Sequence, residues 1–317
     1  MSVIKNSPPT LRLHHPRMLA AALAVAAVLI IAATGVWRLS VQHQRHQLHA
    51  DTAHSLDALA GRVGDQLQGY LGAARILRSE WQRYGSGSAA QFLADAATIH
   101  RAFPGFRALN WVDAGGVIRW VYPRSANRAA ENFDIRSNPR AWSVLRQARA
   151  NGDLAVSGPL SLRQGGDGIT VYLPLQHGGK PQGFINAVID PGVLVQQVYD
   201  PQMRARYDLR ISDGGDTLFS SGAALANPAY AVDSDLRVGA RTWVLRLSPK
   251  SVEAVNDGLG RWLYLAAIVL ALVLAYLCYQ MLITIDERRA VNSATHRVAN
   301  YDRVTGLGNT FLLRSHL

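Results

Sequence analysis

Six aromatic or polar side chains in the middle of the chain have the types expected of a small-molecule site. They lie on segments rich in β-forming residues: Trp111, Arg119, Trp120, Tyr122, Tyr172 and Asn186. An arginine beside aromatic faces suits a carboxylate or a planar ring. Because side chains alternate along a strand, Arg119 is expected on the face opposite Trp120 and Tyr122, so one pocket can use all six only beneath a covering loop. The competing interpretation places the aromatic rings in the core and Arg119 on the surface.

Other residues whose side chains could take part in catalysis or metal binding form no pattern typical of either. The nearest histidine pairs lie at the two ends of an apolar run: His14-His15 and His43/His46. Such positions do not favour a metal site. The glycine-rich residues 163–168 (RQGGDG) lack the Lys-Ser/Thr pair of a phosphate loop. We therefore expect no metal and no cofactor.

Composition excludes two further classes. The net charge of the 317 residues is +11, yet between residues 39 and 260 Lys and Arg outnumber Asp and Glu only by 23 to 19. This near balance, without any nucleic-acid motif, argues against a DNA or RNA partner. The single cysteine, Cys278, permits neither an internal disulfide nor a thiolate metal site.

Two apolar runs, residues 18–37 and 262–285, predict transmembrane helices. Twenty helical residues span about 30 Å, the thickness of the hydrocarbon core. Basic residues lie before the first run and after the second: Lys5, Arg12, Arg17, Arg288 and Arg289. The positive-inside rule then predicts a cytoplasmic tail at residues 1–17, an extracytoplasmic domain at 38–261, and location in the bacterial inner membrane.

A cleaved signal peptide is the alternative for the first run. Its apolar stretch would be shorter, roughly 7–15 residues, and would end in an A-x-A site. The run here is longer and ends in Gly-Val-Trp-Arg. We therefore favour an uncleaved anchor.

The extracytoplasmic segment begins with the pattern of one long helix. Apolar residues recur three or four positions apart: Leu56, Leu59, Val63, Leu67, Tyr70, Ala74, Leu77 and Trp81. This single stripe can pack on its own domain, on a second protomer, or on both. Residues 85–88 (GSGS) end the helix, and residues 91–101 predict a second, shorter one.

Further along, the pattern changes to strands separated by turns and short helices. Strands are predicted at 107–112, 117–122, 168–175, 183–190, 207–212 and 241–247, and helices at 138–150 and 191–199. Residues 113–116 (DAGG) form the first turn, and Pro123 ends the second strand. The predicted fold class is α+β.

Residues 103–195 resemble the CHASE family of extracytoplasmic sensors. The resemblance rests on FPGFRALNWVDAGGVIRWVYP, on Asn132, and on GITVYLPL followed by GKPQGFINAVID. It implies a PAS-like fold that binds a small ligand.

After the second apolar run, residues 286–300 predict a polar linker helix. Val291, Ala294, Val298 and Tyr301 form a short heptad seam, which favours a homodimer. His296 stands where a histidine kinase carries its phospho-acceptor. It lacks the acidic neighbour and the proline expected there, so we interpret it as a solvated helix residue.

Residues 301–317 (YDRVTGLGNTFLLRSHL) resemble the D-x-L-T-G-L-x-N-R opening of GGDEF domains, the diguanylate cyclase fold. Five residues match: Asp302, Thr305, Gly306, Leu307 and Asn309. Val304 and Thr310 replace the usual Leu and Arg. The family's metal-binding and guanine-binding residues and its GG[DE]EF signature lie further on than residue 317. The resemblance therefore implies a truncated output domain, and we expect no enzymatic activity from the chain as given.

These patterns predict the sensory half of a membrane-bound cyclic-di-GMP enzyme, which senses a small extracytoplasmic ligand. One alternative is a stand-alone receptor that acts through a partner protein. Another is the sensory half of a GGDEF-EAL phosphodiesterase. The sequence does not identify the ligand.

Overall fold

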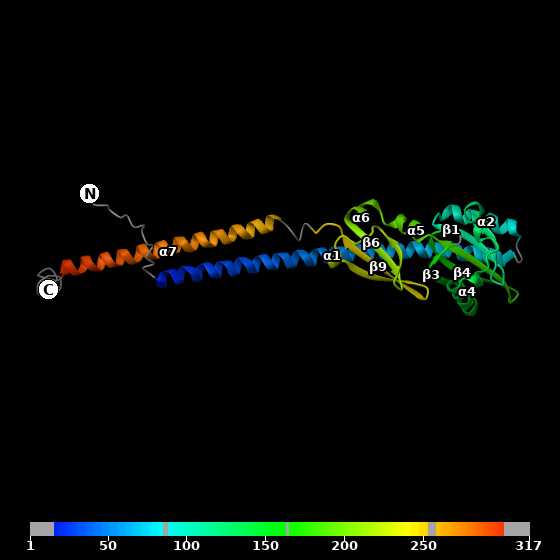
Figure 1. The fold of residues 1–317 in the computed structure, drawn as a ribbon, viewed down its shortest axis with the longest axis horizontal. Coiled ribbons are helices and arrows are strands. Elements are labelled where there is room, and N and C mark those ends of the chain that lie inside the picture. The colour runs from blue at the N-terminus through cyan, green and yellow to red at the C-terminus, as the bar shows by residue number, and fades with distance from the viewer. Residues whose placement is uncertain (1–15, 85–87, 163–164, 253–257, 301–317) are drawn as a thin grey trace, which may run out of the picture. The chain divides into compact units, whose positions relative to one another are not determined.

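The computed structural model describes residues 16–84, 88–162, 165–252 and 258–300. The chain divides into two compact units. One comprises residues 1–44 and 255–317, and the other comprises residues 45–254. Figure 1 shows the ribbon of both units, with labels on many of the helices and strands.

Two long helices contain the predicted apolar runs. Helix α1 (Pro16–Tyr84) has 69 residues and α7 (Gly258–Asn300) has 43. Each is long and apolar enough to cross a membrane, and little of either apolar stretch is buried, unlike the core helix of a soluble protein. Neither helix breaks where its predicted span ends. The long helix predicted from Leu56 to Trp81 is the second part of α1, and the linker helix predicted at 286–300 is the last part of α7.

In the unit that holds both apolar stretches, α1 and α7 contact each other. The ring of Trp37 stacks on that of Tyr264, with centroids 5.0 Å apart, and Thr34 Oγ1 lies 3.0 Å from the Tyr264 hydroxyl. The buried positions of the two stretches are small residues four apart: Ala22, Ala26, Ala271 and Ala275. Small residues let helix backbones approach closely, which is typical of helix pairs in membranes.

The second unit contains a five-stranded antiparallel sheet in the order β2-β1-β5-β4-β3. Its strands are β1 (Phe106–Val112), β2 (Ile118–Tyr122), β3 (Ala155–Ser161), β4 (Asp167–His177) and β5 (Lys180–Ile189). Four of them confirm predicted strands, and β2 ends before Pro123 as expected. Strand β3 escaped prediction because Gly158 and Pro159 interrupt its apolar pattern, where its pairing with β4 shifts register.

A four-stranded antiparallel sheet follows, in the order β7-β6-β9-β8. It consists of β6 (Tyr207–Asp213), β7 (Asp216–Ser220), β8 (Val232–Val238) and β9 (Arg241–Pro249). The sequence predicted β6 and β9 but neither edge strand. Strand β8 (VDSDLRV) has charged residues at three of its seven positions, as edge strands often do, and this obscures the apolar signal. The division of the strands into two sheets was not predicted from the sequence pattern.

Short helices connect these strands: α2 (Ala89–Ala102), α3 (Arg124–Asn127), η1 (Arg128–Ala130), η2 (Ile135–Ser137), α4 (Pro139–Asn151), α5 (Pro191–Val198), α6 (Pro201–Arg206) and η3 (Pro228–Tyr230). Side-chain caps fix where the predicted ones begin. Ser88 caps α2, Asn138 caps α4 and Asp190 caps α5, each accepting hydrogen bonds from backbone N–H groups of the first turn. These caps confirm the helices predicted at 91–101, 138–150 and 191–199.

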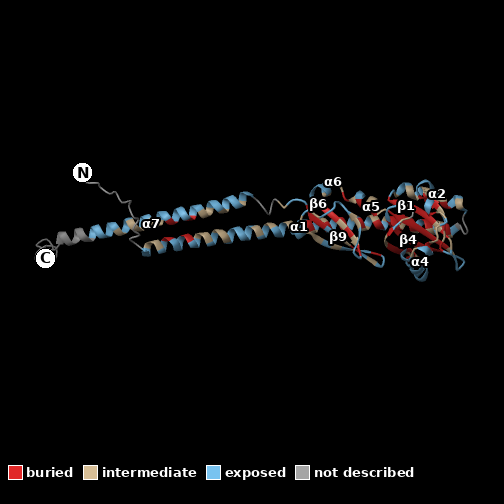
Figure 2. Ribbon diagram, in the orientation of Figure 1, coloured by how far each residue is buried: buried red, intermediate tan, exposed pale blue. Residues whose placement is uncertain are grey.

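The apolar stripe of α1 forms the axis of the main core. All eight stripe residues, from Leu56 to Trp81, are buried, and both sheets pack one face against them (Figure 2). The stripe therefore packs on its own domain. At one end, Ser55 Oγ donates to the Tyr207 hydroxyl of β6 at 3.1 Å, and further along Trp81 contacts Trp111 of β1.

A smaller core lies on the other face of the five-stranded sheet. Helix α4 packs Ala141, Val144, Leu145 and Ala148 against β3 and β4. The segment between β2 and α4 contributes Ala130 and Ile135. Helix α4 and the segment before it cover only part of this face of the sheet, and the cavity that remains between them and the sheet is the candidate site.

Candidate ligand-binding site

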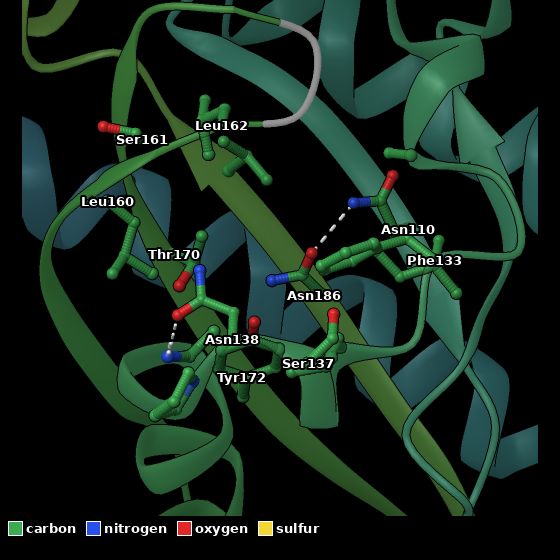
Figure 3. Close-up of a pocket in the computed structure, with 16 residues that line it drawn as sticks. Asn110, Phe133, Ser137, Asn138, Leu160, Ser161, Leu162, Thr170, Tyr172 and Asn186 are labelled. Atoms are coloured by element: carbon green, nitrogen blue, oxygen red, sulfur yellow. Dashed lines mark hydrogen bonds between the residues drawn. The ribbon is translucent and has the colours of Figure 1, made fainter.

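A cavity of about 390 Å³ opens on the face of the five-stranded sheet that turns away from α1 (Figure 3). Its floor is formed by residues of β1, β4 and β5: Asn110, Thr170, Tyr172, Asn186 and Val188. The segment from η1 to the start of α4 forms one wall, with Phe133, Ser137 and Asn138. Leu160, Ser161 and Leu162, at the end of β3, close another side.

Strand alternation places the floor residues. In β1, Leu109 and Trp111 pack toward α1, so Asn110 between them must point to the opposite face. Asn110 lies directly opposite Asn186, and Asn186 lies opposite Tyr172. The three side chains thus form a row across β1, β5 and β4.

Two buried carboxamides meet at the centre of this floor. Asn110 and Asn186 are 1% and 2% exposed, and Asn110 Nδ2 donates to Asn186 Oδ1 at 2.8 Å. Asn186 Nδ2 in turn donates to the Val171 carbonyl at 3.5 Å, a long bond. Asn110 Oδ1 is buried and has no hydrogen-bond partner in the described part of the chain. A buried acceptor without a hydrogen bond lowers the stability of the fold, so its presence calls for an explanation, such as a bound molecule that pairs with it.

Hydroxyl groups extend the polar floor. Thr170 Oγ1 donates to Ser157 Oγ at 3.1 Å, and Ser157 Oγ donates to the carbonyl of Gly158. Burial raises the pKa of Tyr172 to about 12. This effect outweighs that of a hydrogen bond with Thr170, which lowers the pKa. The phenol of Tyr172 is therefore protonated at physiological pH and is available as a neutral donor or acceptor.

The wall segment is held by its own side chains. Asn127, fully buried, donates through Nδ2 to the carbonyls of Arg107 and Pro123, both at 3.0 Å. Asn138 Oδ1 accepts from the backbone N–H of Ala141. Ser137 is exposed at the cavity mouth, and its hydroxyl donates to the Asp134 carbonyl. The mouth is therefore built from locally capped turns.

The structure divides the six residues singled out from the sequence. Tyr172 and Asn186 line the cavity. Trp111 and Trp120 lie on the other face, stacked with centroids 4.4 Å apart and packed on Trp81 of α1 and Phe92 of α2. Tyr122 meets His100 edge to face at 5.5 Å. These three rings belong to the main core, which was the competing interpretation.

Arg119 is part of neither the cavity lining nor the main core. The β1–β2 ladder shifts register beside it, since Trp111 pairs with Trp120 but Val112 pairs with Ile118. This bulge leaves the Arg119 side chain 47% exposed, and its Nε donates to Asp113 at 2.7 Å. Nη1 reaches Asn132, whose φ of 62° is tolerated by asparagine. Arg119 orders the β1–β2 hairpin and does not reach the cavity.

Sequence reasoning missed Asn110, Thr170, Ser137 and Asn138 as cavity residues. A signal for Asn110 was present, because an uncharged polar residue in the middle of the apolar run FRALNWV is unusual on a strand buried on both faces. Asn138 was recognised only as a helix cap. Within the described residues, no group of three or more His, Cys, Asp or Glu side chains could hold a metal ion.

The fold is that of ligand-binding domains of bacterial receptors. It is similar to an extracellular ligand-binding receptor from Desulfohalobium retbaense (13% identity, TM-score 0.53), covering 62% of this chain but only 40% of that one. The amino-acid chemoreceptor PctB of Pseudomonas aeruginosa, in complex with L-Arg, has 13% identity and a TM-score of 0.52, with 66% and 92% covered. CtaA of Pseudomonas fluorescens, in complex with L-isoleucine, has 14% identity and a TM-score of 0.50, with 68% and 97% covered.

Residues 62–221 match the CHASE domain, and the chain belongs to this family. The match extends beyond the residues that carried the resemblance in sequence, and it includes the α1 stripe from Val63 to Trp81 and strands β6 and β7. No curated protein matches the chain. A CHASE domain combined with two apolar helices indicates a membrane protein with a sensor-type domain.

Proposed function

We propose that this protein is a membrane receptor whose CHASE domain binds a small molecule in the cavity of the five-stranded sheet. A cavity of about 390 Å³, whose floor carries the amides of Asn110 and Asn186 and the hydroxyls of Thr170 and Tyr172, carries the proposal. Sites for small molecules are typically clefts of about 300–1,000 Å³ with apolar walls and a few placed polar groups. The amino acids held by chemoreceptor domains of the same fold indicate the size of molecule to test first.

Thermal unfolding of the full chain in nanodiscs, against a metabolite library, tests this proposal. A ligand at a hundredfold excess over its Kd should stabilise the folded state by about 2.7 kcal/mol. Ser137→Trp, which places a large ring at the exposed mouth, should abolish that stabilisation without altering the unliganded melting temperature. The proposal fails if every stabilising compound acts equally well on Ser137→Trp.

We further propose that ligand binding changes how β1 packs on α1. Asn110 faces the cavity while its neighbours Leu109 and Trp111 face the helix, so a shift of this strand acts on both sides. Because α1 is one uninterrupted helix from Pro16 to Tyr84, such a shift has a continuous element along which to travel. The size of the response is limited by the ligand's differential affinity for the two states.

We propose that the receptor is a homodimer in the bacterial inner membrane with its sensor domain outside. A phosphatase reporter fused after Ser248 should be active and one fused after Arg289 silent. Cys278, the single cysteine, lies in the predicted second span and offers a native cross-linking site. Oxidation should give a disulfide-linked dimer that Cys278→Ser does not form. A monomer by light scattering would contradict the dimer.

We propose a cyclic-di-GMP output, supported by the GGDEF-like residues Asp302, Thr305, Gly306, Leu307 and Asn309. These residues lie outside the described part of the structure. We also propose that the 317 residues bind and relay without catalysing, so that purified protein given GTP and magnesium forms no cyclic-di-GMP. Product from a clean preparation would contradict this. Reading the coding DNA beyond Leu317 separates a cyclase from a phosphodiesterase or a receptor that acts through a partner.

A further inference from the structure

The cavity is polar but uncharged. Among its lining residues that the structure describes, the polar side chains are amides and hydroxyls, and none is ionised at neutral pH. Asp134, next to the wall along the chain, accepts from Arg136 at 2.9 Å. The exposed Asp167 accepts at 2.8 Å from Ser161, an exposed residue of the lining. A zwitterionic amino acid at the floor would bury its ammonium and its carboxylate among amides and hydroxyls with no counter-charge there, which is strongly unfavourable.

The hydrogen bonds of the two floor amides indicate their orientation. Asn186 directs Nδ2 toward the Val171 carbonyl at 3.5 Å, and its Oδ1 accepts from Asn110 Nδ2 at 2.8 Å (Figure 3). Asn110 Oδ1 is left as a buried acceptor with no partner among the described residues, on a residue that lines the cavity floor.

We infer that the cavity selects an uncharged molecule whose polar groups pair with the amides and hydroxyls of the floor and whose apolar part packs against Ile118, Phe133 and Val188. The inference rests on the proposed function, since it specifies the ligand class of the same cavity. An uncharged ligand pairs with these groups at no cost in ionic desolvation, whereas a charged one leaves its charge unpaired. The uncharged lining thus acts as a filter on ligand charge.

The test uses the full chain in nanodiscs and a fragment library sorted into neutral, cationic, anionic and zwitterionic sets, read by saturation-transfer NMR. L-arginine and L-isoleucine serve as zwitterionic probes. N-acetyl-L-isoleucinamide is the uncharged match of L-isoleucine. Fragments whose binding is lost in Ser137→Trp are assigned to the cavity. We expect these to be neutral and to bind Asn110→Leu about tenfold more weakly, the loss of one buried hydrogen bond.

Ser248→Ala is the control, because Ser248 is fully buried in the same domain, donates a hydrogen bond to the Asn227 carbonyl and does not line the cavity. It should leave the affinity of the folded fraction unchanged. If Asn110→Leu does not fold, the double variant Asn110→Leu/Asn186→Leu replaces it, since it leaves no stranded amide.

Three results overturn the inference: zwitterionic or charged fragments that bind and whose binding is lost in Ser137→Trp, neutral fragments that bind Asn110→Leu as well as the original protein, or an equal loss of affinity in Ser248→Ala. In each case the cavity would still be a ligand site. If Ser137→Trp affects no fragment at all, the proposed function fails instead.

Discussion

The two sheets pack on the same helix, yet their opposite faces differ. On the five-stranded sheet that face holds a cavity with an unpaired acceptor at Asn110. On the four-stranded sheet, Asp208 and Ser248 form hydrogen bonds with the segment around Asn227. Asp208 accepts from the backbone N–H of Ala226 at 3.0 Å, and Ser248 Oγ donates to the Asn227 carbonyl at 2.8 Å. This face of the four-stranded sheet is thus covered by a segment of its own chain, although Arg210 Nε on β6 is also buried without a partner among the described residues, whereas the five-stranded sheet holds a cavity.

This difference indicates where to look for binding. Buried polar groups are nearly always paired, so an unpaired one needs a reason. Polar groups of the four-stranded sheet hold the segment around Asn227 by hydrogen bonds, such as the one that Asn227 Nδ2 donates to the Pro249 carbonyl at 2.8 Å. On the five-stranded sheet, an unpaired acceptor belongs to Asn110, a residue that lines the cavity. We therefore expect mutations of the two faces to separate stability from binding.

The largest expected effect comes from the core that both sheets share. Trp243 of β9 is 1% exposed and is among the largest fully buried side chains. Trp243→Ala should lower the free energy of unfolding by about 3–5 kcal/mol, because the cavity it leaves cannot collapse completely. Chemical unfolding followed by circular dichroism measures this. Trp142→Ala, at a partly exposed ring of α4, should cost clearly less. Equal losses would contradict a core centred on α1.

A second prediction concerns the closed face. Asp208→Ala should lower the free energy of unfolding by about 1–3 kcal/mol, because it leaves the Ala226 N–H without an acceptor. It also removes the hydrogen bond from Ser221 and the ion pair with Lys250. Asp216→Ala, at a side chain 61% exposed in the same sheet, should change stability by no more than about 0.5 kcal/mol. The comparison of the two faces is weakened if Asp208→Ala is as mild as Asp216→Ala.

The open face should behave in the opposite way. The double variant Asn110→Leu/Asn186→Leu should change the unfolding free energy by less than about 1 kcal/mol or even stabilise, because replacing both partners of a buried hydrogen bond by apolar groups can be nearly neutral. Ligand-induced stabilisation should disappear. A large loss of stability with binding retained would assign these amides a structural role.

The smallest effect is a dependence on pH at the edge of the four-stranded sheet. The hydrogen bond from Arg246 lowers the pKa of Asp233 below its ordinary 3.8, outweighing partial burial, which raises it. The resulting stability is present above that ordinary value and is lost as pH falls through the lowered pKa. Because both side chains are about half exposed, at 50% and 42%, the pair contributes roughly 0.2–1 kcal/mol.

Arg246→Met should therefore reduce stability near neutral pH and converge with the original protein at pH values below the pKa of the paired Asp233. Arg237→Met, on the neighbouring strand β8, is the control and should show no such convergence. Unfolding measured across this pH range decides between them. A constant difference at all pH values would mean that Arg246 acts by packing alone.

Local sequence determined much of the secondary structure. The stripe from Leu56 to Trp81 fixed the face that α1 buries, and Ser88, Asn138 and Asp190 fixed the starts of three helices through caps within a few residues. Alternation in β1 separated Trp111 from Asn110. These features depend on neighbours along the chain, so a period or a cap reveals them.

Only the tertiary structure decided what the separated faces contact. Strand alternation distinguishes two sets of side chains but does not tell which set meets a helix and which meets a cavity. For that reason Trp111, Trp120 and Tyr122 were candidates for a site although they belong to the core. The pairing of Asn110 with Asn186, 76 residues apart, joins strands that are not adjacent in sequence. Pairing across such a distance is set by the packing of the whole domain, which is why the buried acceptor at the cavity floor emerges only when the sheet is assembled.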